Sequence, residues 1–152
     1  MKLTIELKKK LFSYCEDYVN MSIKTLENAL EDAQDAANSD TKGSAGDKHE
    51  TGRAMMHIEK ENNAKILAER LNLRKTLALI NPEEKHVNIK LGSLISTSNG
   101  IFFLAIPIGK VKLEEDFFII SPVSPIGKLL MEKKKGEEFS FNSKIVQIIN
   151  VF

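Results

Sequence analysis

Two carboxylates stand three residues apart in the segment Gly46-Asp47-Lys48-His49-Glu50. Residues at this spacing share one side of a helical turn, so Asp47 and Glu50 could act together. Paired carboxylates are ligands that Mg²⁺ commonly takes, with water and phosphate oxygens completing its coordination. The same spacing is typical of the start of a helix, where Asp caps the first turn and Glu completes something close to a capping box. Both a metal site and a helix start remain open at this point.

Acidic side chains crowd the chain around this pair. Positions 27 to 50 hold seven Asp or Glu residues against Lys42 and Lys48, which leaves about five negative charges. Such a region repels nucleic-acid phosphates and attracts cations. Lys42, Lys48 and Arg53 could contact a phosphate close to the acids, or could be solvated charges that balance them.

Other residue types offer little chemistry. His49 and His57 are eight residues apart with no cysteine nearby, which favours surface histidines over a transition-metal site. Cys15 is the only cysteine, so an internal disulfide framework is excluded and a reducing compartment is favoured. Its apolar surroundings predict a small buried hydrophobic residue. Neither a Ser-His-Asp arrangement nor a phosphate-binding glycine loop is present.

The acidic pair must be positioned by long helices. No proline or glycine interrupts residues 1–42, and apolar residues recur there in steps that average about 3.5, as in a coiled-coil seam. These residues are Phe12, Cys15, Val19, Ile23, Leu26, Leu30, Ala33 and Ala37. Residues 39–46 predict a turn, and a second helix is expected from about Asp47 to Ile80, stopped by Asn81-Pro82. Its seam is expected at Ala64, Leu67, Leu71 and Ala78, with Ile66, Leu73 and Ile80 seven residues apart. Two helices of roughly 33 residues predict an antiparallel pair about 50 Å long.

From Val87 onward, short β-rich runs alternate with turns. Strands are expected at 87–91, 93–96, 101–106, 117–120 and 144–151, with a hairpin turn at 98–100 and a short helix over 126–133. Five phenylalanines are expected in the core: Phe102, Phe103, Phe117, Phe118 and Phe139. The predicted fold class is α+β, with a helical domain over 1–81, its acidic tip around 39–53, and a small α+β domain over 82–152.

Composition narrows the possible classes of protein. The chain has 152 residues and a mass of 17.1 kDa, and its 42% hydrophobic and 28% charged residues suit a folded, water-soluble protein. Its 22 basic and 21 acidic residues give a net charge of +1, so nucleic acid would not be held by bulk charge neutralisation. The apolar run Ile101–Ile108 is too short to span a bilayer, and the N-terminus has no signal-peptide pattern. A cytoplasmic protein without a membrane partner is expected.

The layout resembles that of the Gre-type bacterial transcript cleavage factors, which join an antiparallel coiled coil with an acidic tip to a small FKBP-like domain. Residues 120–137 look like the family's strand, Ser-Pro turn, short helix and Lys-x-x-Gly-Asp ending, with Glu137 in place of the Asp. Gly46–Glu50 is similar to the family's Gly-Asp-x-x-Glu. Thr51-Gly52-Arg53 replaces the acidic and aromatic residues that usually follow it.

The resemblance implies a transcription elongation factor that binds RNA polymerase in its secondary channel. The C-terminal domain would dock on the channel rim through Ser121, Pro122, Ser124 and Pro125, and the coiled coil would enter the channel. Asp47 and Glu50 would be the catalytic and metal-binding acids, which help the polymerase hold a second Mg²⁺ while backtracked RNA is cleaved.

The resemblance also implies which activities the isolated chain would lack. Cleavage would belong to the polymerase, so the protein is not expected to be an enzyme by itself or to bind Mg²⁺ tightly when isolated. Lys42, Lys48 and Arg53 are the RNA-contact candidates, and nascent RNA and DNA would be met only within the elongation complex.

Three alternatives stay open. The protein could occupy the channel and regulate polymerase without stimulating cleavage. It could be an FKBP-like prolyl isomerase or chaperone-like module, although such a site needs an aromatic-lined pocket and the chain has no tryptophan. An obligate dimer through the coiled coil is the third alternative, whereas a monomer is expected if the two helices cover each other's seam.

Overall fold

A computed structural model describes residues 2–40 and 47–152. The chain divides into two compact units. One unit combines Met1–Glu16 with Lys75–Phe152 and is called the sheet unit below. The other, Asp17–Arg74, is called the helical unit. The sheet unit is thus built from both ends of the sequence, and the helical unit from the stretch between them.

Two long helices account for the first half of the chain. Helix α1 spans Ile5–Asp40 and helix α2 spans Asp47–Ala78, which confirms the two predicted helices and the start of the second at Asp47. Thr4 Oγ1 accepts a hydrogen bond from the Leu7 amide at 3.1 Å and so caps α1. After Ala78 a last turn closes through the Ile80 amide and the Leu77 carbonyl at 3.0 Å. Proline at position 82 prevents further helix.

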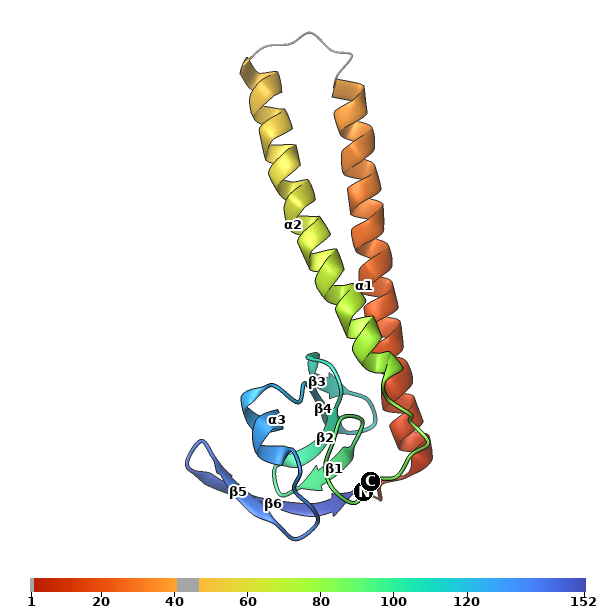
Figure 1. Ribbon diagram of the computed structural model, residues 1–152, viewed down its shortest axis with the longest axis vertical. Coiled ribbons are helices and arrows are strands. Elements are labelled where there is room, and N and C mark those ends of the chain that lie inside the picture. Colours follow the sequence, from red (N-terminus) through yellow and green to blue (C-terminus); the bar gives the residue numbers. More distant parts are fainter. Residues whose placement is uncertain (1, 41–46) are drawn as a thin grey trace. The chain divides into compact units, whose positions relative to one another are not determined.

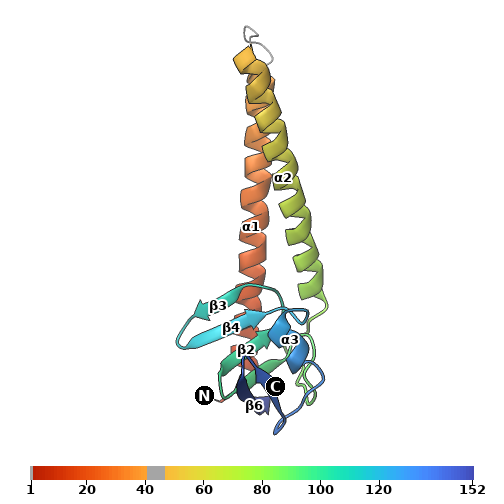
Figure 2. The ribbon, with the colours of Figure 1, turned by 90° about the vertical axis from the view of Figure 1, so that its left-hand side faces the viewer.

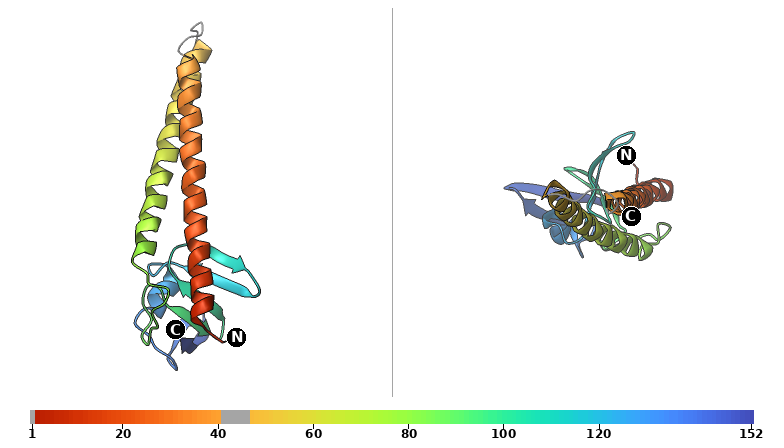
Figure 3. Two further views of the ribbon diagram at one scale, coloured as in Figure 1. Left: turned by 90° about the vertical axis from the view of Figure 1, so that its right-hand side faces the viewer. Right: turned by 90° about the horizontal axis from the view of Figure 1, so that it is seen from above.

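The two helices run antiparallel within the helical unit. Arg74 Nη2 donates to Asn20 Oδ1 at 2.9 Å, and Lys60 donates to Gln34 further along the pair. Because the partner number falls on α2 as it rises on α1, the directions are opposite, as Figures 1 and 2 show. Figure 3 shows the same pair from the side of α1. Of the turn predicted over 39–46, the first two residues belong to α1 and residues 41–46 lie outside the described residues.

The described members of the predicted apolar seam of α1 are all buried or half-buried. Cys15, Val19 and Ile23 are buried, and the remaining described members are half-buried: Phe12, Leu26, Leu30 and Ala33. The side chain of Ala37 lies outside the described residues.

The predicted seam of α2 is confirmed only in part. Of the predicted seam residues, Leu67 and Leu73 are half-buried and Ile80 is buried, whereas the others are exposed: Ala64, Ile66, Leu71 and Ala78. The half-buried positions around Leu67 include Asn63 and Arg70. A search for apolar periodicity could not find a covered face that includes an amide and a guanidinium.

A mixed six-stranded sheet forms the centre of the sheet unit (Figure 1). Its strands are β1 Leu94–Thr97, β2 Gly100–Leu104, β3 Gly109–Lys112, β4 Asp116–Ile120, β5 Glu138–Phe141 and β6 Lys144–Val151. Their order is β3-β4-β2-β1-β6-β5. Strands β2 and β4 are parallel, and all other neighbours are antiparallel. Together with the helices, this sheet confirms the α+β class.

The strand predictions are confirmed only in part. The hairpin turn is confirmed, because Thr97 pairs with Gly100 across it and Gly100 has a φ of 122°, a value that favours glycine. Strands β3 and β5 were not predicted. The expected strand at 87–91 is wrong, since this segment makes only an isolated bridge between Asn88 and Lys134.

One face of the sheet packs against helix α3, Pro125–Leu130, which is shorter than the predicted 126–133. Leu130 is fully buried there with Ile95, Leu104 and Ile148. Four of the five phenylalanines predicted for the core are buried; Phe118 is half-buried and stacks on Phe102 with ring centroids 5.2 Å apart. Within residues 2–40 and 47–152, none of the helices has the length and apolar character needed to cross a bilayer.

Candidate functional site

The acidic pair lies at the start of α2. Asp47 is the first residue of the helix, and Glu50 follows in its first turn. Lys42 lies outside the described residues, and for Asp47, Lys48 and Glu50 only the backbone is described. Two carboxylates in one helical turn are a donor set that suits Mg²⁺, which prefers hard oxygen ligands. Among the side chains that the structure describes, no three His, Cys, Asp or Glu residues gather as a metal site.

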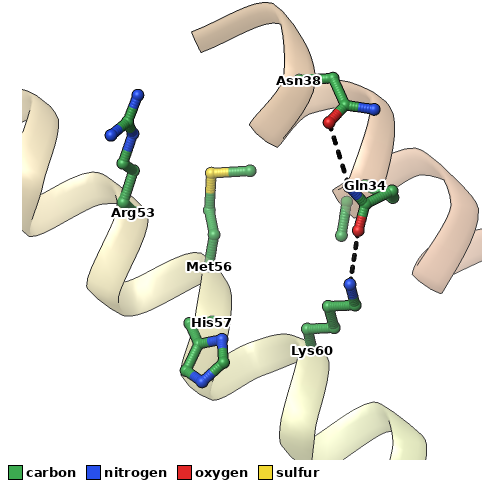
Figure 4. Close-up of a pocket in the computed structure, with 7 residues that line it drawn as sticks. Gln34, Asn38, Arg53, Met56, His57 and Lys60 are labelled. Atoms are coloured by element: carbon green, nitrogen blue, oxygen red, sulfur yellow. Dashed lines mark hydrogen bonds between the residues drawn. The ribbon is translucent and has the colours of Figure 1, made fainter. Parts of the chain in front are cut away.

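Arg53 lines a groove one to two turns further along α2 (Figure 4). The groove has a volume of about 340 Å³ and lies between α1 and α2. It is lined by Ala33, Gln34, Asn38, Arg53, Met56, His57 and Lys60. Arg53, His57 and Lys60 recur at four- and three-residue steps, so they share one face of the helix. This face brings three basic groups beside the amides of α1.

Two of these basic groups already have partners. Lys60 Nζ donates to Gln34 Oε1, and Gln34 Nε2 donates to Asn38 Oδ1 at 3.1 Å, as the dashed lines in Figure 4 show. His57 Nε2 lies 3.1 Å from Glu61 Oε1. Arg53 is exposed and has no hydrogen bond or ion pair within the described part of the chain. No described residue therefore competes with an anion for its guanidinium. His57 was expected only to be a surface side chain, which it is.

The Ser-Pro turn before α3 is held by its own serines. Ser124 Oγ accepts from the Gly127 amide at 3.1 Å and donates to the Ser121 carbonyl at 2.6 Å. Ser121 Oγ accepts from the Val123 amide at 3.2 Å. A Cβ on Gly127 would lie 2.1 Å from the Ser121 carbonyl oxygen, so only glycine fits this approach.

The predicted docking residues of this turn differ in their exposure to solvent. Ser121 and Ser124 are half-buried and shape the turn, and Pro122 is also half-buried. Pro125 is exposed as the first residue of α3, and Val123, which sequence reasoning did not single out, is 74% exposed. The exposed apolar surface of this turn therefore comes mainly from Val123 and Pro125.

A buried lysine, not predicted from the sequence, lies in the sheet unit. Lys8 is fully buried, and its Nζ donates to the Glu84 carbonyl at 2.6 Å and lies 5.7 Å from the centroid of the Phe152 ring. Burial lowers the pKa of Lys8 to about 8, with the Glu84 carboxylate opposing the shift. In the run Lys8-Lys9-Lys10 this residue looks like a solvated charge. Its position seven residues before Cys15, on the same helical face, was the available indication.

His86 lies beside this lysine and is also buried. Its Nδ1 is 2.6 Å from Ser93 Oγ. Burial lowers the pKa of His86 to about 4, and the ammonium groups of Lys8 and Lys90 add to the shift. Lys90 forms a 3.0 Å ion pair with Glu84 and holds the pKa of that carboxyl below its usual range. His86 is therefore neutral at pH 7.

No protein-family model matches this chain, and no curated protein or solved structure matches it either. The resemblance described above accordingly depends on the layout of the chain and on its two motifs alone.

Proposed function

We propose that this protein is a Gre-type transcription elongation factor that binds bacterial RNA polymerase in its secondary channel and stimulates cleavage of backtracked RNA. The observation that carries the proposal is the start of α2 at Asp47, which puts Asp47 and Glu50 into one helical turn at the end of an antiparallel helix pair. In this proposal the helix pair is a coiled coil. The sheet unit is an FKBP-like domain that docks on the polymerase.

Each part of the candidate site has a role in this proposal. Asp47 and Glu50 contribute carboxylate oxygens to a Mg²⁺ site that the polymerase completes. When bound there, Mg²⁺ supplies activation of water and stabilisation of charge on the scissile phosphate. Arg53 contacts an RNA phosphate with its free guanidinium, and Lys42 and Lys48 are further contacts of the same kind. The chain itself is a cytoplasmic stimulator of the polymerase's own nuclease activity.

Stalled, backtracked elongation complexes test the proposal. Adding the protein with Mg²⁺ is expected to release short RNA fragments from the 3′ end. Asp47→Asn and Glu50→Gln should each abolish fragment release, because one lost carboxylate removes a metal ligand and its charge. Asp35→Asn is the matched control, since it removes one exposed acid from α1 and should leave release unchanged. An Asp47→Asn variant with full activity would exclude the metal site.

A channel-binding regulator that does not stimulate cleavage is the second candidate. The observation that favours it is the replacement of the family's acidic and aromatic residues by Thr51-Gly52-Arg53 after Glu50. Two measurements separate the two candidates: competition between the unmodified protein and its Asp47→Asn variant for the polymerase, and fragment release by each protein. Binding by both proteins with no fragments from either would establish the regulator. If neither protein binds polymerase, both candidates fail.

A further inference from the structure

A second groove opens on the helical unit, formed by different residues from those around Arg53. Its volume is about 380 Å³. The lining residues are Tyr18, Met21, Ser22, Thr25 and Leu26 of α1, with Ile66 and Arg70 of α2. Met21 is 72% exposed and Ile66 is 37% exposed, so an apolar rim faces the solvent. Arg70 is the only charged residue of the lining.

Arg70 has hydrogen-bonding capacity that the helix pair does not use. Its guanidinium carbon lies 5.8 Å from the centroid of the Tyr18 ring, and its Nε is buried without a hydrogen-bond partner. Within the described residues Arg70 forms no ion pair. By contrast, Arg74, one turn later, donates to Asn20 Oδ1 at 2.9 Å. Buried donors without partners are rare because each costs the lost solvation of the group.

The chemistry of this groove selects its occupant. A guanidinium pairs best with a carboxylate or a phosphate, to which it can offer two parallel hydrogen bonds. Residues 17–74 carry 8 basic and 11 acidic side chains, a balance that disfavours a polyanion such as nucleic acid. A single carboxylate set among apolar groups matches one arginine beside Met21 and Ile66. The shape between two helices suits the side chains of a third helix.

We propose that this groove docks a helical segment of a partner protein, with one carboxylate of the partner on Arg70 and aliphatic side chains on Met21 and Ile66. The guanidinium turns away from the Tyr18 ring to meet the carboxylate. The apolar contacts exclude water around the ion pair and strengthen it. This docking surface does not depend on the function proposed above, since Asp47, Glu50 and Arg53 are not part of the groove.

A designed peptide tests the proposal on the full chain. The probe is a capped, alanine-rich helical peptide of about 16 residues with two leucines four residues apart and a glutamate between them. The protein carries ¹³C-labelled methionine methyl groups, and NMR follows the signals of Met21 and Met55. Met21 lines the groove, whereas Met55 is 67% exposed but does not, so it serves as the internal reference. We expect the Met21 signal to shift on titration and the Met55 signal to stay.

Two comparisons test whether the ion pair between the peptide carboxylate and Arg70 contributes to binding. A peptide with glutamine in place of glutamate should bind at least about tenfold more weakly, the loss of one charge-assisted hydrogen bond. Arg70→Gln should produce a similar loss with the glutamate peptide. Arg74→Gln, the matched control, should leave binding within about twofold. The peptide comparison needs no variant, so it decides the question even if Arg70→Gln folds poorly.

Three results would overturn the proposal. Equal binding of the two peptides excludes Arg70 as a carboxylate site. A Met21 signal that never shifts excludes the groove as a docking surface. A Met21 shift that grows with protein concentration and without peptide means that a second copy of the chain occupies the groove instead.

Discussion

His86 is an imidazole that the fold keeps neutral, and this gives the protein an acid-sensitive residue. An unfolded histidine titrates near pH 6.5, whereas the pKa of buried His86 is about 4. Between these values the unfolded chain binds a proton that the folded chain does not, so stability falls as pH falls. We expect His86 to contribute roughly 2 kcal/mol of this loss between pH 7 and about pH 4.5.

The His86→Gln variant isolates this contribution. Glutamine keeps a polar contact to Ser93 but does not titrate. Urea unfolding of both proteins at the two pH values should show a smaller loss for the variant. Carboxylates elsewhere titrate equally in both proteins and cancel in the comparison. Parallel losses in the two proteins would exclude His86 as the acid-sensitive residue.

Cys15 is fully buried, and burial raises the pKa of its thiol to about 12. Because the thiolate is the reactive form, the folded protein should resist a disulfide reagent such as DTNB at about pH 8. In denaturing urea, one thiol per chain should react at once. Rapid labelling of the folded protein would show that α1 opens around this residue far more often than its burial suggests.

At the scale of single residues, the apolar side chains of α1 were the predictable ones. Cys15, Val19 and Ile23 were expected inside from their spacing, and they are. Lys8 and His86 could not be expected there, because a charged or polar type predicts exposure. Their burial depends on partners far away in the sequence, such as the Glu84 carbonyl, 76 residues from Lys8.

At the scale of elements, the turn before α3 depends on a glycine. Gly127→Ala would place a methyl group 2.1 Å from the Ser121 carbonyl oxygen, so the Ser121–Ser124 contacts must open. We expect a loss of roughly 3 kcal/mol in the free energy of unfolding, measured by urea denaturation. Gly52→Ala is the control: beyond its neighbours in the helix, no described atom lies within 4 Å of its added Cβ, and alanine favours helix by about 0.5–1 kcal/mol. Two equally destabilised variants would contradict this account.

Elements with strong periodicity or a clear turn were predictable, and those without were not. The extents of helices α1 and α2 and the β1–β2 hairpin follow the predicted patterns, although the seam predicted within α2 does so only in part. Strands β3 and β5 each contain a single buried residue, Val111 and Phe139, so no alternation marks them. Residues 87–91 alternate as a strand would, but only an isolated bridge at Asn88 forms there. Pairing partners, rather than local pattern, decide such segments.

At the scale of the whole molecule, we expect a monomer. The apolar face of α1 is already covered within the chain, so no second copy is needed to cover it. Sedimentation equilibrium should give a single species of 17.1 kDa. A species of twice this mass that persists on dilution would support the obligate dimer.

The position of the candidate site in the sequence could be predicted, but not which side chains lie close together there. Asp47 and Glu50 stand out by spacing, and α2 does begin at Asp47. The groove at Arg53 could not be predicted, because Gln34 and Asn38 reach it from the other helix. Contacts between helices depend on their register, and the seam proposed for α2 had the wrong register at Ala64 and Leu71.

The sheet unit draws on both ends of the chain, and this has a consequence for synthesis on the ribosome. Leu3, Lys8 and Leu11 leave the ribosome before Lys75–Phe152, but they are buried in a unit that also needs this later segment. These side chains stay unburied until residues 75–152 have been synthesised, a delay of several seconds at typical elongation rates. The two helices of the helical unit can pair during this delay. Residues 1–16 are thus made before the helical unit but reach their final environment only after residues 75–152 have been made.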